Sequence, residues 1–355
     1  MTNNNRPRLA ATIAGLALVV VAISGSESSA KSKQPKPEPT PPPRAISVST
    51  QLIQEAAAYS AYMTRTTAIS PGFTDGASVA RSLATGVAYE PNAMVRGAMA
   101  YGAVVALQDK AFMDAFKSYK SEQQRQEVAF AILRNPYYVT AFPGAASAGA
   151  TVADVIGGQG RAVYDQGKVI KQSAYDIQHA AWSKGEVADR AGRLAATKTA
   201  SSAPPMSDSA AVARLQEAMT TTRASTMMSP APSANTTLVN RSLAVAALAA
   251  LGHGDDAHFN EISGLMADPG GVTCMKLAKL NLYQCLAVAK PHYEDVFCLG
   301  EHVMMDTGRC LMKATGAVVP ETPPKMQMSA TARPYNPVAK RPTAKKPAAK
   351  KLAAK

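Results

Sequence analysis

Apolar residues repeat at helical spacing through much of the stretch from 46 to 198. Ahead of Asn135 and Pro136, positions three and four residues apart predict one helix with a shared face. That face carries Phe112, Phe116, Tyr119, Gln123, Gln126, Phe130 and Leu133. Asn135 and Pro136 should end the helix, because the residue before a proline avoids the helical region of the backbone.

A second helix is predicted further along this stretch. Its apolar stripe contains Val163, Ile170, Ala174, Ile177 and Ala181, with Lys168, Lys171 and Asp176 off the stripe and Tyr164, Tyr175 and Trp182 at its edge. Just before it, Gly158-Gln159-Gly160 matches the first half of a dinucleotide-binding fingerprint. Val163 replaces the last glycine of that motif and no strand precedes it, so we expect a loop or a helix start.

Segments 74–88 and 93–107 are rich in Ala and Gly. Small residues let helix backbones approach closely, so both segments are predicted to be helices of a soluble core. Residues 199–236 interrupt the pattern with Ser, Thr and Pro, and contain one short helical candidate at 209–219. We interpret 199–236 as a linker between two helical parts.

The second helical part covers 237–318. It opens with Asn235 or Thr236 as a helix cap, followed by an Ala- and Leu-rich helix over 238–251 that ends at Gly252. Hydrophobic residues make up 46% of the chain and aromatic residues only 6%, which with the abundant Ala favours helices over sheet. The predicted fold class is all-α, with an Ala-rich, bundle-like body over 45–198 and 237–318.

The first 30 residues have the pattern of a secretory signal peptide. Arg6 and Arg8 precede an apolar stretch over 9–23, and Ser28-Ser29-Ala30 supplies the small residues of a cleavage site, so the mature chain would begin at Lys31. An uncleaved N-terminal membrane anchor is the alternative. In either case the rest of the chain is exported, to the periplasm or cell envelope. Residues 31–44 are Pro-rich and predict a semi-rigid spacer.

The net charge of +13 belongs mainly to the two ends of the chain. Residues 1–30 contribute one net positive charge, 31–44 contribute three and 333–355 contribute eight, which leaves one for 45–332. The helical body is therefore almost neutral, and any attraction to a polyanion would come from the tails.

The C-terminal segment 319–355 predicts a disordered basic tail rich in Ala, Lys and Pro. Its last part, AKRPTAKKPAAKKLAAK over 339–355, resembles the tails of linker histones and of bacterial histone-like proteins. The resemblance implies a polyanion partner; for an exported protein we expect anionic lipids or envelope polymers and no specific nucleic acid. The candidate binding residues are Lys340, Arg341, Lys345, Lys346, Lys350, Lys351 and Lys355. A tail that only solubilises the protein is the alternative.

The four cysteines form the most specific pattern in the chain. They are Cys274, Cys285, Cys298 and Cys310, an even number within 37 residues. In an exported protein this indicates disulfides. A zinc site would need ligand pairs two to four residues apart, and here 10, 12 and 11 residues intervene. No CxxC motif is present, which argues against a redox-active pair.

Helix geometry favours one of the three possible pairings. Residues 274–289 predict a helix in which Cys274 and Cys285 lie about 16 Å apart, beyond the reach of a disulfide, yet on nearly the same face. If 298–310 is an antiparallel helix, Cys274 pairs with Cys310 and Cys285 with Cys298. The design is similar to the doubly bridged hairpin of twin-cysteine coiled-coil-helix proteins. Cys310 is expected about 120° around its helix from Cys298, which makes the outer bridge the less secure one.

Histidines and acids supply weaker candidates. His253 and His258 flank Asp255 and Asp256, and His292, Glu294, Asp295, His302 and Asp306 lie among the cysteines. His302 and Asp306 stand one helical turn apart, an acceptable metal pair. The simpler interpretation is that 253–258 forms a turn after a helix and that the acids lie in exposed loops.

Motifs for serine hydrolases, HExxH metalloenzymes and phosphate-binding loops are absent from the sequence. We therefore expect a non-enzymatic cell-envelope protein without a cofactor. An unrecognised envelope enzyme and a periplasmic metal-binding module that uses His253 and His258 are the alternatives.

Overall fold

The computed structural model describes residues 46–221, 223 and 236–320, and these residues fold into helices joined by short loops. No strand occurs among them; two isolated β-bridges are the only extended pairing there. The predicted signal peptide at 1–30, the spacer at 31–44 and the basic residues of the tail lie outside the described residues.

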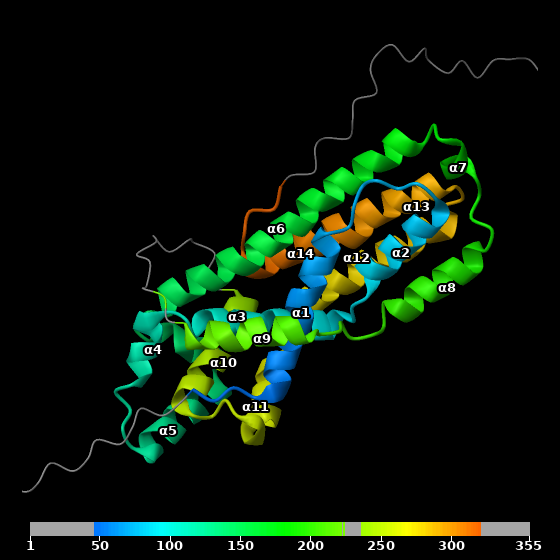
Figure 1. Cartoon of the computed structure of the whole chain (residues 1–355). Helices are drawn as coiled ribbons and strands as arrows, with labels where there is room; N and C mark the ends of the chain where they lie inside the picture. The colour runs from blue at the N-terminus through cyan, green and yellow to red at the C-terminus, as the bar shows by residue number, and fades with distance from the viewer. Residues whose placement is uncertain (1–45, 222, 224–235, 321–355) are drawn as a thin grey trace, which may run out of the picture. The chain divides into compact units, whose positions relative to one another are not determined.

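The helices of the first part of the chain are α1 (Thr50–Thr67), α2 (Gly76–Val87), α3 (Pro91–Ala106), α4 (Lys110–Phe116), α5 (Glu122–Arg134), the 3-10 helix η1 (Pro136–Ala141), α6 (Ala145–Ile177), α7 (Ala181–Lys184), α8 (Arg190–Ala200) and α9 (Ser209–Thr220). The second part contains α10 (Thr237–Leu251), the 3-10 helix η2 (Asp256–His258), α11 (Phe259–Leu265), α12 (Pro269–Val288), α13 (His292–Cys298), the π-helix η3 (Leu299–Met305) and α14 (Asp306–Thr315). Figure 1 shows their arrangement.

Several helix ends follow the capping signals in the sequence. The Thr236 hydroxyl accepts a hydrogen bond from the Val239 amide at the start of α10, and Gly252 ends that helix with φ of 89°. Only a residue without Cβ adopts such a left-handed conformation without strain. The prediction of this helix, with Thr236 as its cap, is confirmed. Asn135 also ends the α-helix before it, as expected, and Pro136 then begins the 3-10 helix η1.

The helix predicted across 112–133 is wrong in its middle. α4 ends at Phe116 and α5 begins at Glu122, with Ser121 as its cap. Ser121 and Gln124 form a capping box, which satisfies amides at a new helix start and so favours a break over continuation. As a result, Phe116 is buried but Phe130 is 63% exposed.

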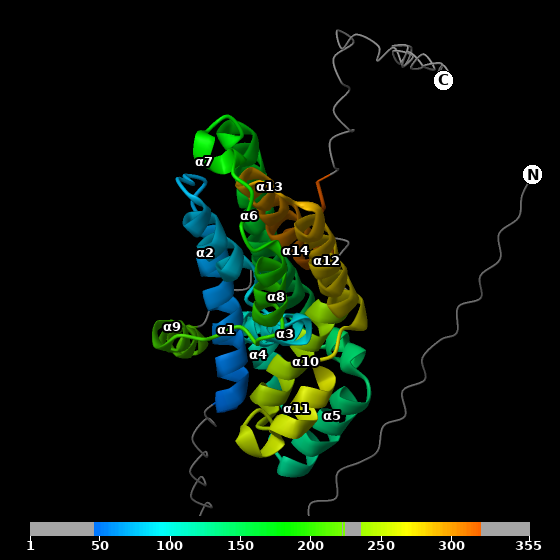
Figure 2. The same cartoon turned by 90° about the vertical axis from the view of Figure 1, so that its right-hand side faces the viewer.

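Both predicted helical parts contribute to one hydrophobic core. Tyr59, Phe112 and Ile156 from the first part and Leu248 and Met304 from the second are almost fully buried in the same cluster. α3 packs against both α1 and α10 (Figures 1 and 2). The helix predicted at 209–219 is present as α9 and packs on α1.

Glycines let α6 lie directly against the C-terminal helices. Gly158-Gln159-Gly160 lies in the middle of α6, so the expectation of a loop or helix start is wrong. A Cβ at Gly160 would lie 2.9 Å from the carbonyl oxygen of Gly308, and one at Gly167 would lie 2.9 Å from that of Gly300. Backbone therefore meets backbone where α6 runs alongside η3 and α14 (Figures 1 and 2).

Candidate functional site

Two disulfides join α12 to the helices that follow it. Cys274 is bonded to Cys310 and Cys285 to Cys298, with Cα–Cα distances of 5.6 and 5.8 Å. The nested pairing predicted from helix geometry is confirmed. No cysteine of the chain remains free. Disulfides of this kind are typical of proteins in oxidising compartments such as the periplasm or the extracellular space.

The π-helix η3 explains why the outer disulfide fits better than expected. Along a regular α-helix, Cys310 would lie about 120° around from Cys298. A π-helical turn contains one extra residue, which turns the following residues back by about 100°. Because η3 lies between the two cysteines, both point toward α12, with an offset of only about 20°.

α8 holds the end of α12 through two arginines. The last carbonyl groups of a helix lack partners within that helix. Arg190 donates from Nε to the Ala289 carbonyl at 2.9 Å and from Nη2 to the Ala287 carbonyl at 2.8 Å. Arg193 donates from Nη2 to the Leu286 and Ala289 carbonyls. These bonds connect α8 to the disulfide-bonded helices.

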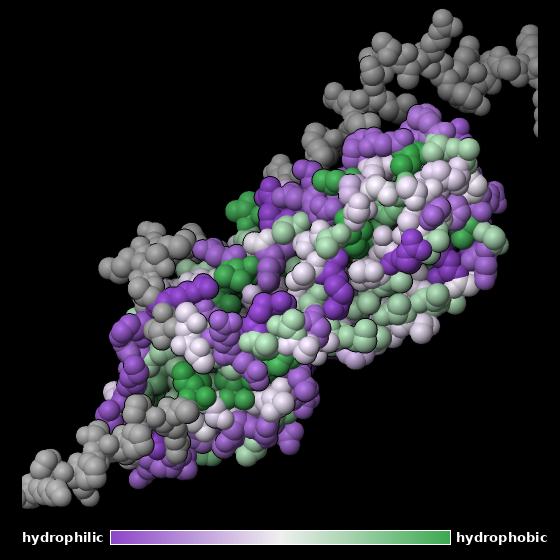
Figure 3. All heavy atoms as spheres, viewed as in Figure 1, coloured by the Kyte–Doolittle hydropathy of each residue, from purple (hydrophilic) through white to green (hydrophobic). Residues whose placement is uncertain are grey.

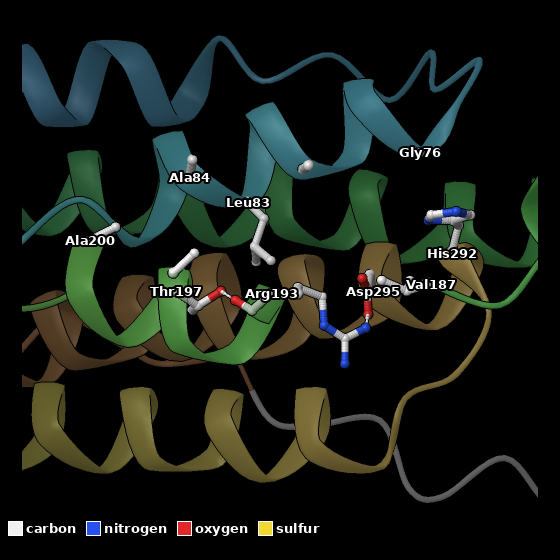
Figure 4. Close-up of a pocket in the computed structure, with 11 residues that line it drawn as sticks. Gly76, Leu83, Ala84, Val187, Arg193, Thr197, Ala200, His292 and Asp295 are labelled. Carbon is white, nitrogen blue, oxygen red and sulfur yellow. Dashed lines mark hydrogen bonds and ion pairs between the residues drawn. The ribbon is translucent and has the colours of Figure 1, made fainter. Parts of the chain in front are cut away.

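A small pocket lies between α2, α8 and α13. Its volume is about 220 Å³. Exposed alanines of α2 and α8 form its rim, while Leu83, Thr197 and Asp295 are buried at its floor. In Figure 4, Ala84 and Ala200 stand at one end of the view and Gly76 and His292 at the other. The walls are mostly apolar, so the pocket suits an apolar group.

The polar part of the pocket is an ion pair. Arg193 Nη1 donates to Asp295 Oδ1, and the two side chains are only 10% and 4% exposed. Figure 4 shows them pointing toward one another from α8 and α13. Burial raises the pKa of Asp295, although the hydrogen bond and charge of Arg193 act in the opposite direction. The buried Nε–H of Arg193 has no hydrogen-bond partner in the protein.

His292 closes one end of the pocket against Gly76. A Cβ at Gly76 would lie 2.7 Å from His292 Nε2, so any side chain there would push the imidazole out of its present position. The main chain on the other side is held by the pairing of 185–187 with 290–292, in which the Val187 amide donates to the Lys290 carbonyl at 2.9 Å. The end wall is therefore built from three segments distant in sequence.

The histidine pair predicted as a metal candidate comes together in space. The rings of His253 and His258 lie 4.6 Å apart between centroids, and His258 Nδ1 lies 2.7 Å from Asp255 Oδ1. Burial, followed by the nearby His258, lowers the pKa of His253. Asp256 instead accepts a hydrogen bond from the Thr50 amide at 2.8 Å, so it caps α1. This cluster connects η2 to the start of α1.

His302 and Asp306 belong to a network of charges on η3 and α14. His302 Nδ1 lies 2.9 Å from Asp306 Oδ2, and Arg309 Nη1 lies 2.8 Å from Asp306 Oδ1. Burial raises the pKa of Asp306, but hydrogen bonds from His302, Asn281 and Arg309 together hold it below its usual value. Glu301 adds ion pairs with Lys171 and Arg309. Within the described ranges, no group of three or more His, Cys, Asp or Glu side chains is arranged to hold a metal.

Lys279 is a buried cation that the sequence does not reveal. It lies on α12 with 6% exposure, its Nζ donates to the Val87 carbonyl at 3.0 Å, and it stands 3.7 Å from the centre of the Tyr89 ring. Burial lowers its pKa to about 7, and the nearby Glu90 raises it only in part. The Tyr89 hydroxyl pairs with Thr307 at 2.9 Å. Lys279 therefore connects α12 to the chain between α2 and α3.

Most residues of the pocket were missed by sequence reasoning. Asp295 was expected in an exposed loop beside Glu294 but is buried, because α13 begins at His292 and turns this carboxylate toward Arg193. That expectation is wrong for Asp295. Arg193 gives no local signal, because its partners lie about one hundred positions further along the chain. The seven candidate basic residues of the tail lie outside the described residues, and their role stays a prediction.

On the face shown in Figure 3, hydrophobic and hydrophilic residues are interspersed over the helices in small groups. Among the helices of the described residues, none is long and apolar enough to span a membrane.

Comparison with known proteins identifies no relative: no family model, no curated protein and no solved structure matches the chain.

Proposed function

We propose that this chain is an exported, non-enzymatic protein of the cell envelope whose basic tail contacts anionic polymers or lipids. The helical body is nearly neutral, whereas residues 333–355 carry eight positive charges and no negative one. Electrostatic attraction to an envelope polyanion would therefore reside in the tail.

The observation that carries the proposal is the pairing of all four cysteines in two disulfides. Such bonds persist outside the reducing cytosol, in the same compartments that the N-terminal signal pattern predicts. Each bridge is expected to stabilise the fold by about 2–4 kcal/mol, which suits a protein exposed to the outside of the cell.

The experiment compares the mature full-length protein with a chain that ends after Ala332, by co-sedimentation with vesicles that contain anionic lipid and with isolated cell-wall material. The full-length protein should bind at about 50 mM salt and much less at about 200 mM, because the added salt ions screen the Lys and Arg charges and compete for the phosphate and carboxylate groups of the polyanion. The truncated protein should not bind in either case.

A control variant of the same length but without these charges separates binding by charge from other effects of the tail. Here the seven candidate residues are replaced by Gln in the full-length chain: Lys340, Arg341, Lys345, Lys346, Lys350, Lys351 and Lys355. This variant should behave as the truncated chain does. Co-sedimentation that does not depend on the salt concentration, or that persists after both the truncation and the Gln substitutions, would show that the tail only solubilises the protein.

A further inference from the structure

We infer that the turn after α10 is an acid-sensitive clasp on the start of α1, which opens when the His253 imidazole takes up a proton. The clasp consists of residues 252–258, from the glycine that ends α10 to the end of η2. This property is independent of the basic tail and of the proposed function.

The clasp holds the residues that lead into α1 through hydrogen bonds and a backbone contact. The Ser49 amide donates to the Gly254 carbonyl at 2.7 Å, and the Asp256 carboxylate accepts from the amide and the hydroxyl of Thr50 at 2.8 and 3.1 Å. A Cβ at Gly254 would overlap the Ser47 carbonyl oxygen, so the two backbones touch. Because the first amides of a helix have no acceptor within that helix, these contacts fix the position where α1 begins.

The His253 side chain has no acceptor for the proton that an imidazolium ion adds. Its ring lies 4.6 Å from that of His258, and its Nε2 is buried without a hydrogen-bond partner among the described residues. A protonated imidazole carries an N–H on both ring nitrogens, so the cation would bury a donor that nothing accepts. Water can accept that bond once the clasp is open, and proton uptake therefore favours the open form.

The titratable groups that act on His253 come from α5, α11 and the clasp itself, and are Glu122, Glu261, Asp255 and His258. Glu122 also pairs with Arg125 at 2.6 Å, and Asp255 lies 2.7 Å from His258 Nδ1. The first turn of α1 carries no charged residue.

These surroundings set the direction of the pH effect. The three acids favour a charged imidazole, but burial and the nearby His258 outweigh them and hold the pKa of His253 below its usual value of 6.5. The closed clasp therefore keeps His253 neutral at pH 7. As the pH falls below 6.5, the open clasp takes up the proton more readily, so the balance shifts from the closed to the open form.

Hydrogen exchange of backbone amides in the disulfide-bonded protein at pH 7.5, 6.5 and 5.5 tests this inference. The Ser49 and Thr50 amides report opening, because their acceptors lie on the clasp. After correction for the intrinsic exchange rates, their protection factors should fall about threefold or more between pH 7.5 and pH 5.5, with about tenfold as the limit for one histidine. The Val187 amide, which donates to the Lys290 carbonyl, reports opening of another part of the fold.

Variants of two histidines separate the clasp from other effects of acid. His253→Phe keeps an aromatic ring beside His258 but cannot take up a proton, so the protection of Ser49 and Thr50 should stay the same at all three pH values. His179→Phe is the matched control, because His179 is exposed just after α6, and it should show the pH dependence of the wild type. His253→Lys carries a charge throughout and should lower the protection already at pH 7.5.

Lys279 also gains a proton in this range, so the wild type is compared at each pH with His253→Phe, which retains Lys279. The same pH dependence in both chains would overturn the role of His253. Unchanged protection of Ser49 and Thr50 in the wild type, or an equal loss at Val187, would overturn a local clasp. If His253→Phe does not fold, the NMR titration of the wild-type ring signals decides: a His253 that titrates at or above pH 6.5 would refute the inference.

Discussion

Replacing the buried Lys279 with Met is expected to stabilise the protein in mildly acidic solution. The Lys279 ammonium lies on α12 among apolar groups, with the Val87 carbonyl and the Tyr89 ring as its partners. These contacts offset only part of the lost hydration, since burial lowers its pKa from 10.5 to about 7. Methionine has a similar length and no charge, and its thioether packs well against an aromatic ring.

The size of the effect on the free energy of unfolding follows from the difference in the pKa of Lys279 between the folded and the unfolded chain. Between about pH 7 and pH 10, the unfolded chain holds the Lys279 proton and the folded chain does not, so stability rises with pH. Well below pH 7 both states hold it, and the folded state bears the full cost of roughly 5 kcal/mol. At pH 9 that cost has fallen to roughly 2 kcal/mol. The free energy of unfolding of the wild type should therefore rise by roughly 3 kcal/mol between pH 6 and pH 9, compared with that of Lys279→Met.

The assay is urea unfolding followed by circular dichroism at pH 6, 7, 8 and 9. The Val87 carbonyl keeps a partner in the variant, because it also accepts from the Tyr89 amide at 2.7 Å. Lys276→Met is the control, since Lys276 is exposed on the same helix and its change should have little effect at any pH. The reasoning fails if the difference between wild type and Lys279→Met is independent of pH, or if the variant is the less stable protein at pH 6.

Three shorter predictions concern covalent structure, processing and packing. Peptide mass spectrometry without reduction should recover Cys285 linked to Cys298, and Cys285→Ala should lower the free energy of unfolding by about 2–4 kcal/mol; four free thiols would contradict this. N-terminal sequencing of the mature protein should begin at Lys31, whereas an intact Met1 in the membrane fraction would establish an anchor. In thermal unfolding, Gly160→Ala should destabilise the protein by about 1–3 kcal/mol, because its Cβ would meet the α14 backbone. The control Gly158→Ala adds a Cβ that meets nothing within 4 Å and should stabilise α6 by roughly 0.5–1 kcal/mol. Similar effects at both sites would refute the close contact.

Local signals predicted the parts of the fold that depend on neighbours in sequence. The Thr236 cap and the Gly252 end of α10 rest on hydrogen bonds and backbone conformations within a few residues. The disulfide pairing was also accessible, because a helix places residues eleven positions apart on one face, and the length of the connection leaves only the antiparallel return.

The spacing of apolar residues could not distinguish one long helix from two consecutive shorter ones. The apolar pattern across α4 and α5 agrees with one helix, but the capping box at Ser121 starts a second one. The π-helical turn of η3 was also not visible in the sequence. Gly300 in η3 and Gly308 in α14 both pack directly against α6, and the turn corrects the expected orientation of Cys310.

The helical character of the chain, many of its helix ends and the pairing of its cysteines could be predicted from the sequence, because these properties follow from interactions within one helix or one hairpin. In contrast, the contact of Gly160 with Gly308, the ion pair of Arg193 with Asp295 and the burial of Lys279 beside Val87 became visible only in the folded structure. Each of those contacts joins residues roughly one hundred or more positions apart. Such contacts depend on which helix faces pack together, and many faces of an Ala-rich chain are nearly equivalent until the whole core is assembled.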